Sequence, residues 1–145
     1  MSVRDLAITH AAECRAAIAN GKPRPKWEGG SLSGTYLGGA DLGGADLGGA
    51  DLGGADLGGA YLGGTNLGGT KGIASFGPVG NEHRIIYGVS HTDGTRFQAG
   101  CFWGTADKLR AAIAEKYADG SGLEKYRASY LLAVDVIIAA LAAQE

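Results

Sequence analysis

The sequence predicts a fold of mainly β character with flanking helices, organised around a tandem five-residue repeat. Three observations predict it: leucine recurs at every fifth position in the middle of the chain, glycine is concentrated there, and both flanks have ordinary composition. Of the 27 glycines, 18 lie between Gly29 and Gly72. A length of 145 residues fits one domain, or one small domain with an appended module. We divide the chain into residues 1–26, 27–71 and 72–145.

The repeat unit has a fixed internal order. Each leucine follows a small residue two positions earlier and a polar or aromatic residue one position earlier, and from Gly38 onward two glycines follow it. A period of five fits neither an α-helix nor a β-strand, and collagen needs glycine at every third residue. A regular apolar stripe also argues against a disordered linker. The stripe consists of Leu32, Leu37, Leu42, Leu47, Leu52, Leu57, Leu62 and Leu67.

Tandem Ala-Asp-Leu-Gly-Gly units, as at residues 40–44, resemble the pentapeptide-repeat family. The resemblance implies a right-handed quadrilateral β-helix, a short β-solenoid of about two coils, in which each pentapeptide forms one side of the coil. The leucines and the small residues before them then point inward. Trp27 lies five residues before Leu32, so it takes the same inward position beneath Leu47, at the closed end of the shaft. Trp27 and the eight leucines are therefore the predicted structural core.

The uniform Gly-Gly pairs depart from the family, in which the two outward positions vary. Glycine leaves these directions bare and costs backbone entropy at each corner. Recent duplication of one unit and deliberate engineering both explain the uniformity, and the sequence does not separate them. A shaft of about two coils also needs caps at its ends, because a repeat stack cannot bury its terminal faces.

The N-terminal flank is predicted to supply one cap. Residues 3–20 have helical periodicity, and Asn20-Gly21 ends the helix. Two prolines within residues 22–26 then require an extended segment leading into Trp27. The predicted apolar face of the helix consists of Val3, Ala7, Ala11, Cys14 and Ile18.

The C-terminal flank is predicted to be a ββαα module. Residues 84–91 and 95–102 are rich in β-branched and aromatic side chains, and Thr92-Asp93-Gly94 between them is typical of a hairpin. Thr105 is a good N-cap for a helix that ends near Asp119-Gly120. A second helix, residues 123–143, is apolar around most of its circumference, so it is either buried or paired with another chain.

The same module also resembles the C-terminal part of phage-encoded pentapeptide-repeat proteins. The resemblance rests on residues 76–80, on residues 99–105 and on a following helix that contains Tyr126. It implies a phage-derived, non-enzymatic structural or protein-interaction protein whose partner is unknown. Self-association through the C-terminal helix or the shaft ends is a further expectation.

Composition excludes several other classes. A net charge of −2 and a pI of about 5.9 give no basic surface for direct nucleic-acid binding. The longest apolar runs are too short to span a bilayer, so we expect no membrane association. Two cysteines, Cys14 and Cys101, fit a reducing cytoplasm, in a bacterial or phage-infected cell. We expect no cofactor.

One enzymatic alternative deserves a test. The segment Gly100-Cys101-Phe102-Trp103-Gly104 is similar to the active-site segment of peptide methionine sulfoxide reductase A, which implies Cys101 as nucleophile. That family has a glutamate where this chain has Ala106, and it needs a longer domain than the 44 residues that follow Cys101. We therefore predict no catalytic residue and interpret Cys101 as a small buried strand residue beside two core aromatics.

Metal binding and DNA mimicry are the remaining alternatives. The spacing of His83, His91 and Cys101 matches no zinc pattern. The repeat aspartates fall on different sides of a square coil and cannot converge on calcium, so we expect them to be solvated or hydrogen-bonded to corner amides. Some family members resemble duplex DNA and inhibit a topoisomerase such as DNA gyrase. A shaft on the order of 10 Å tall is too short for that mimicry. The aspartates are Asp41, Asp46, Asp51 and Asp56.

Overall fold

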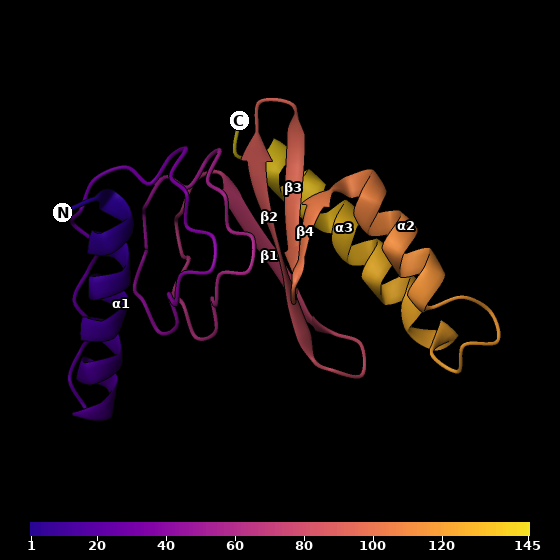
Figure 1. The fold of residues 1–145 in the computed structure, drawn as a ribbon, viewed down its shortest axis with the longest axis horizontal. Helices are drawn as coiled ribbons and strands as arrows, with labels where there is room; N and C mark the ends of the chain where they lie inside the picture. Colours follow the sequence, from indigo (N-terminus) through magenta and orange to yellow (C-terminus); the bar gives the residue numbers. More distant parts are fainter. The chain divides into compact units, whose positions relative to one another are not determined.

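The computed structural model describes all residues from Met1 to Glu145, which form two compact units. The N-terminal unit comprises Met1–Gly72, and the C-terminal unit comprises Ile73–Glu145. Helix α1 and the repeat tract make up the first unit, and a sheet with two long helices makes up the second (Figure 1). None of the helices combines the length and the apolar character that a bilayer crossing requires.

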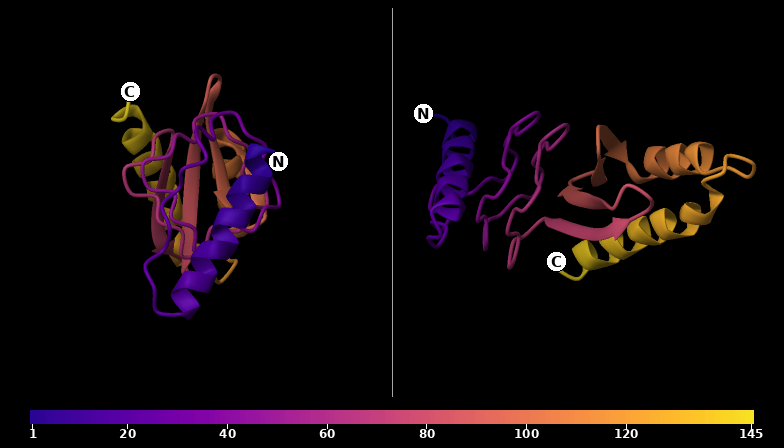
Figure 2. Two further views of the ribbon diagram at one scale, coloured as in Figure 1. Left: turned by 90° about the vertical axis from the view of Figure 1, so that its left-hand side faces the viewer. Right: turned by 90° about the horizontal axis from the view of Figure 1, so that it is seen from below.

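Helix α1, Val3–Ala19, begins at an N-cap and ends where the sequence predicts. The Ser2 hydroxyl accepts a hydrogen bond from the Asp5 N–H at 3.1 Å. The helix lies across the N-terminal end of the repeat tract (Figure 2) and buries a narrow face of mostly small side chains. Ile18, expected on that face, is 53% exposed, because the buried face ends one turn earlier. The buried residues are Ala7, His10, Ala11 and Cys14.

The repeat tract is a β-solenoid whose coils pair in parallel. Its isolated bridges join residues twenty positions apart, so one coil spans four pentapeptides. Between coils, the Leu37 N–H donates to the Asp56 carbonyl at 2.8 Å, and the Asp56 N–H donates to the Thr35 carbonyl at 3.0 Å. The leucines point inward and form the core of this unit. The bridges are Tyr36 with Asp56, Asp41 with Tyr61, Asp46 with Asn66, and Asp51 with Lys71.

The C-terminal unit contains a four-stranded antiparallel sheet in the order β1-β2-β3-β4. The predicted ββαα arrangement is therefore wrong by two strands, and the unit is ββββαα. Its strands are β1, Ile73–Val79; β2, Arg84–His91; β3, Gly94–Ala99; and β4, Phe102–Thr105.

Both additional strands have a local explanation. Strand β1 contains Pro78, which removes a backbone donor, but β1 lies at the sheet edge, where proline is tolerated. Its pairing with β2 is irregular between Phe76 and Val79. The predicted strand at residues 95–102 is broken by a turn at Gly100, which has a φ of 63°. Beyond the turn, β4 runs back along β3.

Two helices cover one face of this sheet. Helix α2, Ala106–Lys116, packs on β3 and β4, and α3, Arg127–Ala142, packs on β1 and β2. A short 3₁₀ helix, η1, Glu124–Tyr126, precedes α3. The core between the layers includes Ile86, Phe97, Leu109, Ile113, Val134 and Ile137. Helix α3 is thus buried along one side within its own unit, while Leu132 on another side is 55% exposed.

Candidate functional site

The aspartates of the repeat accept hydrogen bonds from backbone N–H groups two residues further along the chain. The Asp41 Oδ1 atom accepts a hydrogen bond from the Gly43 N–H at 3.0 Å. This bond to the amide two residues ahead is an Asx turn, which suits the short side chains of Asp and Asn. Of the two expected arrangements, solvation and hydrogen bonding to corner amides, the second is present in the structure. The same bond occurs from Asp46 to Gly48, Asp51 to Gly53, Asp56 to Gly58, and Asn66 to Gly68.

The two glycines of each pair have different backbone roles. At one corner the Ala40 N–H donates to the Leu37 carbonyl at 3.0 Å, which closes a turn over Gly38 and Gly39. Gly39 has a φ of 70°, as the third position of a type II turn requires, whereas Gly38 does not have a positive φ. The second glycine is therefore needed for the turn, and the first is not.

Helix α1 supplies hydrogen-bond donors to the first coil. Carbonyls of the second coil accept from the first coil, but the equivalent first-coil carbonyls have no coil before them. Arg4 donates to the Tyr36 carbonyl at 3.3 Å and to the Gly38 carbonyl at 3.0 Å. The His10 Nε2 atom lies 2.7 Å from the Asp46 carbonyl and must carry the proton there, since a carbonyl only accepts.

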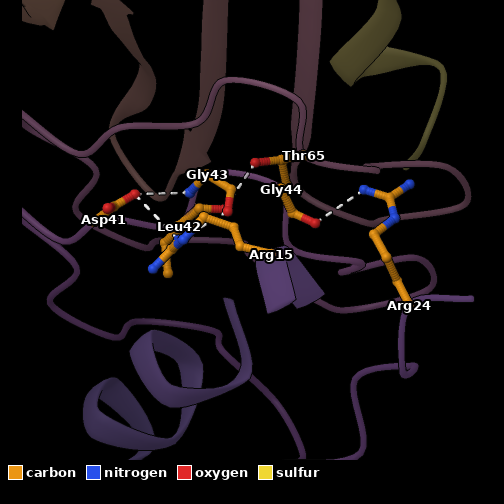
Figure 3. Close-up of polar contacts among 7 residues, drawn as sticks. All are labelled: Arg15, Arg24, Asp41, Leu42, Gly43, Gly44 and Thr65. Carbon is orange, nitrogen blue, oxygen red and sulfur yellow. Dashed lines mark hydrogen bonds and ion pairs between the residues drawn. The ribbon is translucent and has the colours of Figure 1, made fainter. Parts of the chain in front are cut away.

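Arg15 and Arg24 continue this pattern on a neighbouring side (Figure 3). Arg15 donates to the Gly43 carbonyl at 2.8 Å and forms an ion pair with Asp41 at 3.3 Å. Arg24 donates to the Gly44 carbonyl at 2.9 Å and to the Gly64 carbonyl at 3.0 Å, so it joins two coils. The N-terminal segment thus replaces a missing coil by side-chain donors, which protects an open backbone edge.

The cap donors were missed by sequence reasoning, which concentrated on the apolar face of α1. The spacing of Arg4 and Arg15 does carry a signal, because eleven residues are close to three helical turns. His10 and Cys14 are four residues apart and are both buried. The Cys14 Sγ atom accepts from the Asp46 N–H at 3.4 Å, so Cys14 also belongs to the cap.

The large exposed side chains of the solenoid are two tyrosines. Tyr36 is 62% exposed and Tyr61 is 63% exposed. They lie on neighbouring sides of the coils, because Tyr36 bridges to Asp56 and Tyr61 bridges to Asp41. The Tyr61 ring lies over glycine backbone: a Cβ atom at Gly43 would fall 2.6 Å from it. The Arg4 guanidinium lies 5.2 Å from the Tyr36 ring centroid, a cation–π contact.

The predicted core residues have different degrees of burial. The leucines from Leu32 to Leu57 are at most 1% exposed, and Leu62 is 4% exposed, whereas Leu67 is half-buried. Trp27 is also half-buried. Its indole N–H donates to the Gly30 carbonyl at 2.7 Å, and its ring meets His10 edge-on at 5.3 Å. Trp27 therefore packs against His10 of α1. The sequence had suggested a different position, beneath Leu47 inside the shaft.

Cys101 is exposed, so its interpretation as a buried strand residue is wrong. It lies in the turn between β3 and β4, because Gly100 ends the strand that was expected to continue. Helix α2 begins only at Ala106, with Thr105 as its N-cap, so the helix N-terminus does not lie at the thiol. His83, His91 and Cys101 do not come together, and no cluster of three metal-ligating side chains exists in the structure.

A pocket of about 330 Å³ lies in the C-terminal unit. The β3–β4 turn, α2 and α3 line it, and Arg84 contributes from β2. Tyr117 and Tyr130 stack there with ring centroids 4.7 Å apart. Burial is the main cause that raises the pKa of the Tyr130 hydroxyl above its usual value, and the neighbouring Tyr117 raises this pKa further. Sequence reasoning missed this pocket because its polar residues are far apart in the chain.

These geometries define a β-solenoid protein with a capped first coil and a second unit of α+β type. Residues 31–69 match the Pentapeptide repeats family, with eight copies in that span. The repeat tract is therefore similar to pentapeptide repeats over these residues. No curated protein and no solved structure matches the chain.

Proposed function

We propose that this chain is a phage-derived, non-enzymatic interaction protein whose partner protein binds the tyrosine-bearing sides of the solenoid. The solenoid in this proposal is a right-handed quadrilateral β-helix of about two coils. The twenty-residue spacing of its bridges and the five-residue repeat support four sides per coil. The short shaft is then a rigid support that presents side chains at fixed positions.

The observation that carries the proposal is the exposure of Tyr36 and Tyr61, the large apolar side chains that remain exposed on a repeat surface rich in glycine. Both rings are more than 60% exposed, and glycine surrounds them. Tyrosine is enriched at protein interfaces because it buries a large area and loses little conformational freedom. Since Arg4 and the glycine backbone hold these rings in place, they pay little entropy when a partner covers them.

Site-specific photo-crosslinking tests the proposal. A photoreactive phenylalanine analogue is placed at position 36, 61 or 51 of the chain expressed in a phage-infected or bacterial cell. Asp51 is the matched control, because it is exposed on another side of the same solenoid. We expect one protein to crosslink at positions 36 and 61 and not at position 51. Equal crosslinking at all three positions, or none, would contradict the proposal.

The two alternative functions are tested with the purified chain. A topoisomerase inhibitor would block DNA supercoiling by gyrase, and a reductase would convert methionine sulfoxide to methionine. We expect neither activity. The Asp Oδ1 atoms of the repeat already bind backbone amides, and Cys101 lies away from a helix N-terminus. Sulfoxide reduction that disappears in Cys101→Ser would establish the enzymatic alternative instead.

A further inference from the structure

The pocket of the C-terminal unit has an apolar body. Its volume is about 330 Å³, which is within the size range of small-molecule sites. Side chains from the β3–β4 turn and from α2 form most of its wall. They are Ala99, Phe102, Leu109, Ala112 and Ile113. A compact aromatic or branched group would therefore lose its contact with water on entering the pocket.

Tyr130 is an unsatisfied polar group in the wall of this pocket. The residue is 3% exposed, and its hydroxyl is buried without a hydrogen-bond partner. Arg84 and Tyr117 both lie close enough to this hydroxyl to shift its pKa, although no hydrogen bond of normal geometry joins either of them to it. A buried hydroxyl without a partner destabilises the folded state. Tyr130 thus places a poorly satisfied hydroxyl beside Arg84 in the wall of the pocket.

The mouth of the pocket carries an excess of positive charge. Arg84 and Lys116 both line the pocket, and both pair with the carboxylate of Glu82. The hydrogen bond from Arg84 and the nearby charge of Lys116 hold the pKa of Glu82 below its usual value. Two cations thus share one anion, and the Glu82 side chain is 47% exposed. An anion from solution can compete with it.

We propose that this pocket binds a small apolar carboxylate. The apolar body of the ligand lies against Phe102 and Ile113, and its carboxylate takes the place of Glu82 beside Arg84 and Lys116. The Tyr130 hydroxyl then donates to a carboxylate oxygen. This site is separate from the tyrosines of the solenoid, so either proposal can fail without the other.

Binding of phenylacetate to the full chain tests the site, with phenylacetamide as the neutral control of the same shape. Isothermal titration measures both. We expect phenylacetate to bind with a Kd on the order of 1 mM, because it has few atoms, and phenylacetamide to bind at least about fivefold more weakly. N-acetylphenylalanine distinguishes the source of the carboxylate: tighter binding than phenylacetate indicates the C-terminus of a peptide, and weaker binding indicates a free small acid.

Variants assign the contacts. Lys116→Met is expected to weaken phenylacetate binding about fivefold, and Glu82→Gln to strengthen it by a similar factor, because the competing anion is removed. Lys108→Met is the control, since Lys108 is exposed on the same helix and does not line the pocket. Tyr130→Phe is expected to weaken binding about threefold or more through loss of the hydroxyl donor.

Cys101 provides an independent readout. It is exposed and lines the pocket, whereas Cys14 is buried. Bound phenylacetate is therefore expected to slow alkylation of Cys101 by iodoacetamide. Equal binding of acid and amide, no binding of either, or equal losses in Lys116→Met and Lys108→Met would overturn the proposal.

Discussion

Alanine substitutions at Gly53 and Gly54 separate the two roles of a glycine pair. The two residues are adjacent in one corner of the solenoid, but only Gly54 has a positive φ, of 72°. A Cβ atom at Gly54 would lie 3.6 Å from its nearest neighbour, the Gly34 nitrogen. That distance is an ordinary contact, so the cost of Gly54→Ala comes from backbone strain rather than from a clash.

The expected magnitudes follow from two opposing effects. Alanine in the left-handed region costs about 1–2 kcal/mol, and the loss of unfolded-state freedom on replacing glycine returns about 0.4–1 kcal/mol. Gly54→Ala should therefore lower the free energy of unfolding by about 1 kcal/mol. At Gly53 the strain is absent, but the nearest atom to an added Cβ is Asp51 Oδ1 at 3.3 Å, which the Gly53 N–H holds by a hydrogen bond. The entropic gain of Gly53→Ala is therefore offset by displacement of this carboxylate, and the free energy of unfolding should stay within about 0.5 kcal/mol of the parent value.

Urea unfolding followed by tryptophan fluorescence measures the difference. The chain has two tryptophans, and Trp103 belongs to the C-terminal unit. A Trp103→Phe background leaves Trp27 as the reporter of the N-terminal unit, so unfolding of the two units is not confused. Equal free energies for the two alanine variants, or a larger loss at Gly53, would refute the assigned roles of the pair.

Three further predictions concern other parts of the structure. Leu47→Asp should abolish the cooperative transition of Trp27 fluorescence. Leu47 is 0% exposed, so the substitution places an unpaired carboxylate in the apolar core at a large cost in solvation free energy. Arg15→Met should lower the free energy of unfolding of the N-terminal unit by about 1 kcal/mol, by loss of its bond to the Gly43 carbonyl; no change in the urea midpoint would contradict the cap assignment. Tyr130→Phe should raise the melting temperature at pH 7. Burial raises the pKa of the Tyr130 hydroxyl above its unfolded value of about 10. Above that pH the unfolded chain ionises this group more readily than the folded protein, so the free energy of unfolding falls as pH rises. The advantage of Tyr130→Phe should therefore increase above that pH.

The sequence was most informative where one residue type has one structural use. Leucine at every fifth position predicted an inward stripe, and Leu32 to Leu57 are buried. The four aspartates that precede leucines were predicted to be solvated or bonded to corner amides, and the bonds to corner amides are present. Thr105 was predicted as an N-cap, and its hydroxyl accepts from the Lys108 N–H at 3.3 Å. Each of these inferences needs only local geometry, which a repeat or a cap motif specifies.

The sequence was less informative where distant contacts decide. Strand β1 contains Pro78 and is stable as an edge strand only because β2 pairs with it. A single strand through residues 95–102 was a reasonable prediction from β-branched and aromatic content, but Gly100 turns the chain there. The burial of His10 depends on a carbonyl 36 residues away, and no local pattern marks it. The unpartnered hydroxyl of Tyr130 likewise depends on how α3 meets the sheet.

The cap chemistry also restricts how a partner can bind the solenoid. Between the coils, backbone N–H and carbonyl groups satisfy one another, and α1 covers first-coil carbonyls with donors from Arg4, His10 and Arg15. A partner strand therefore finds little free backbone to extend at that end. Binding at the sides must then use side chains, and most outward positions are glycine, which has none. Tyr36 and Tyr61 are the large apolar side chains that remain exposed on the repeat, so removal of these two rings should eliminate binding while the backbone ladder stays intact.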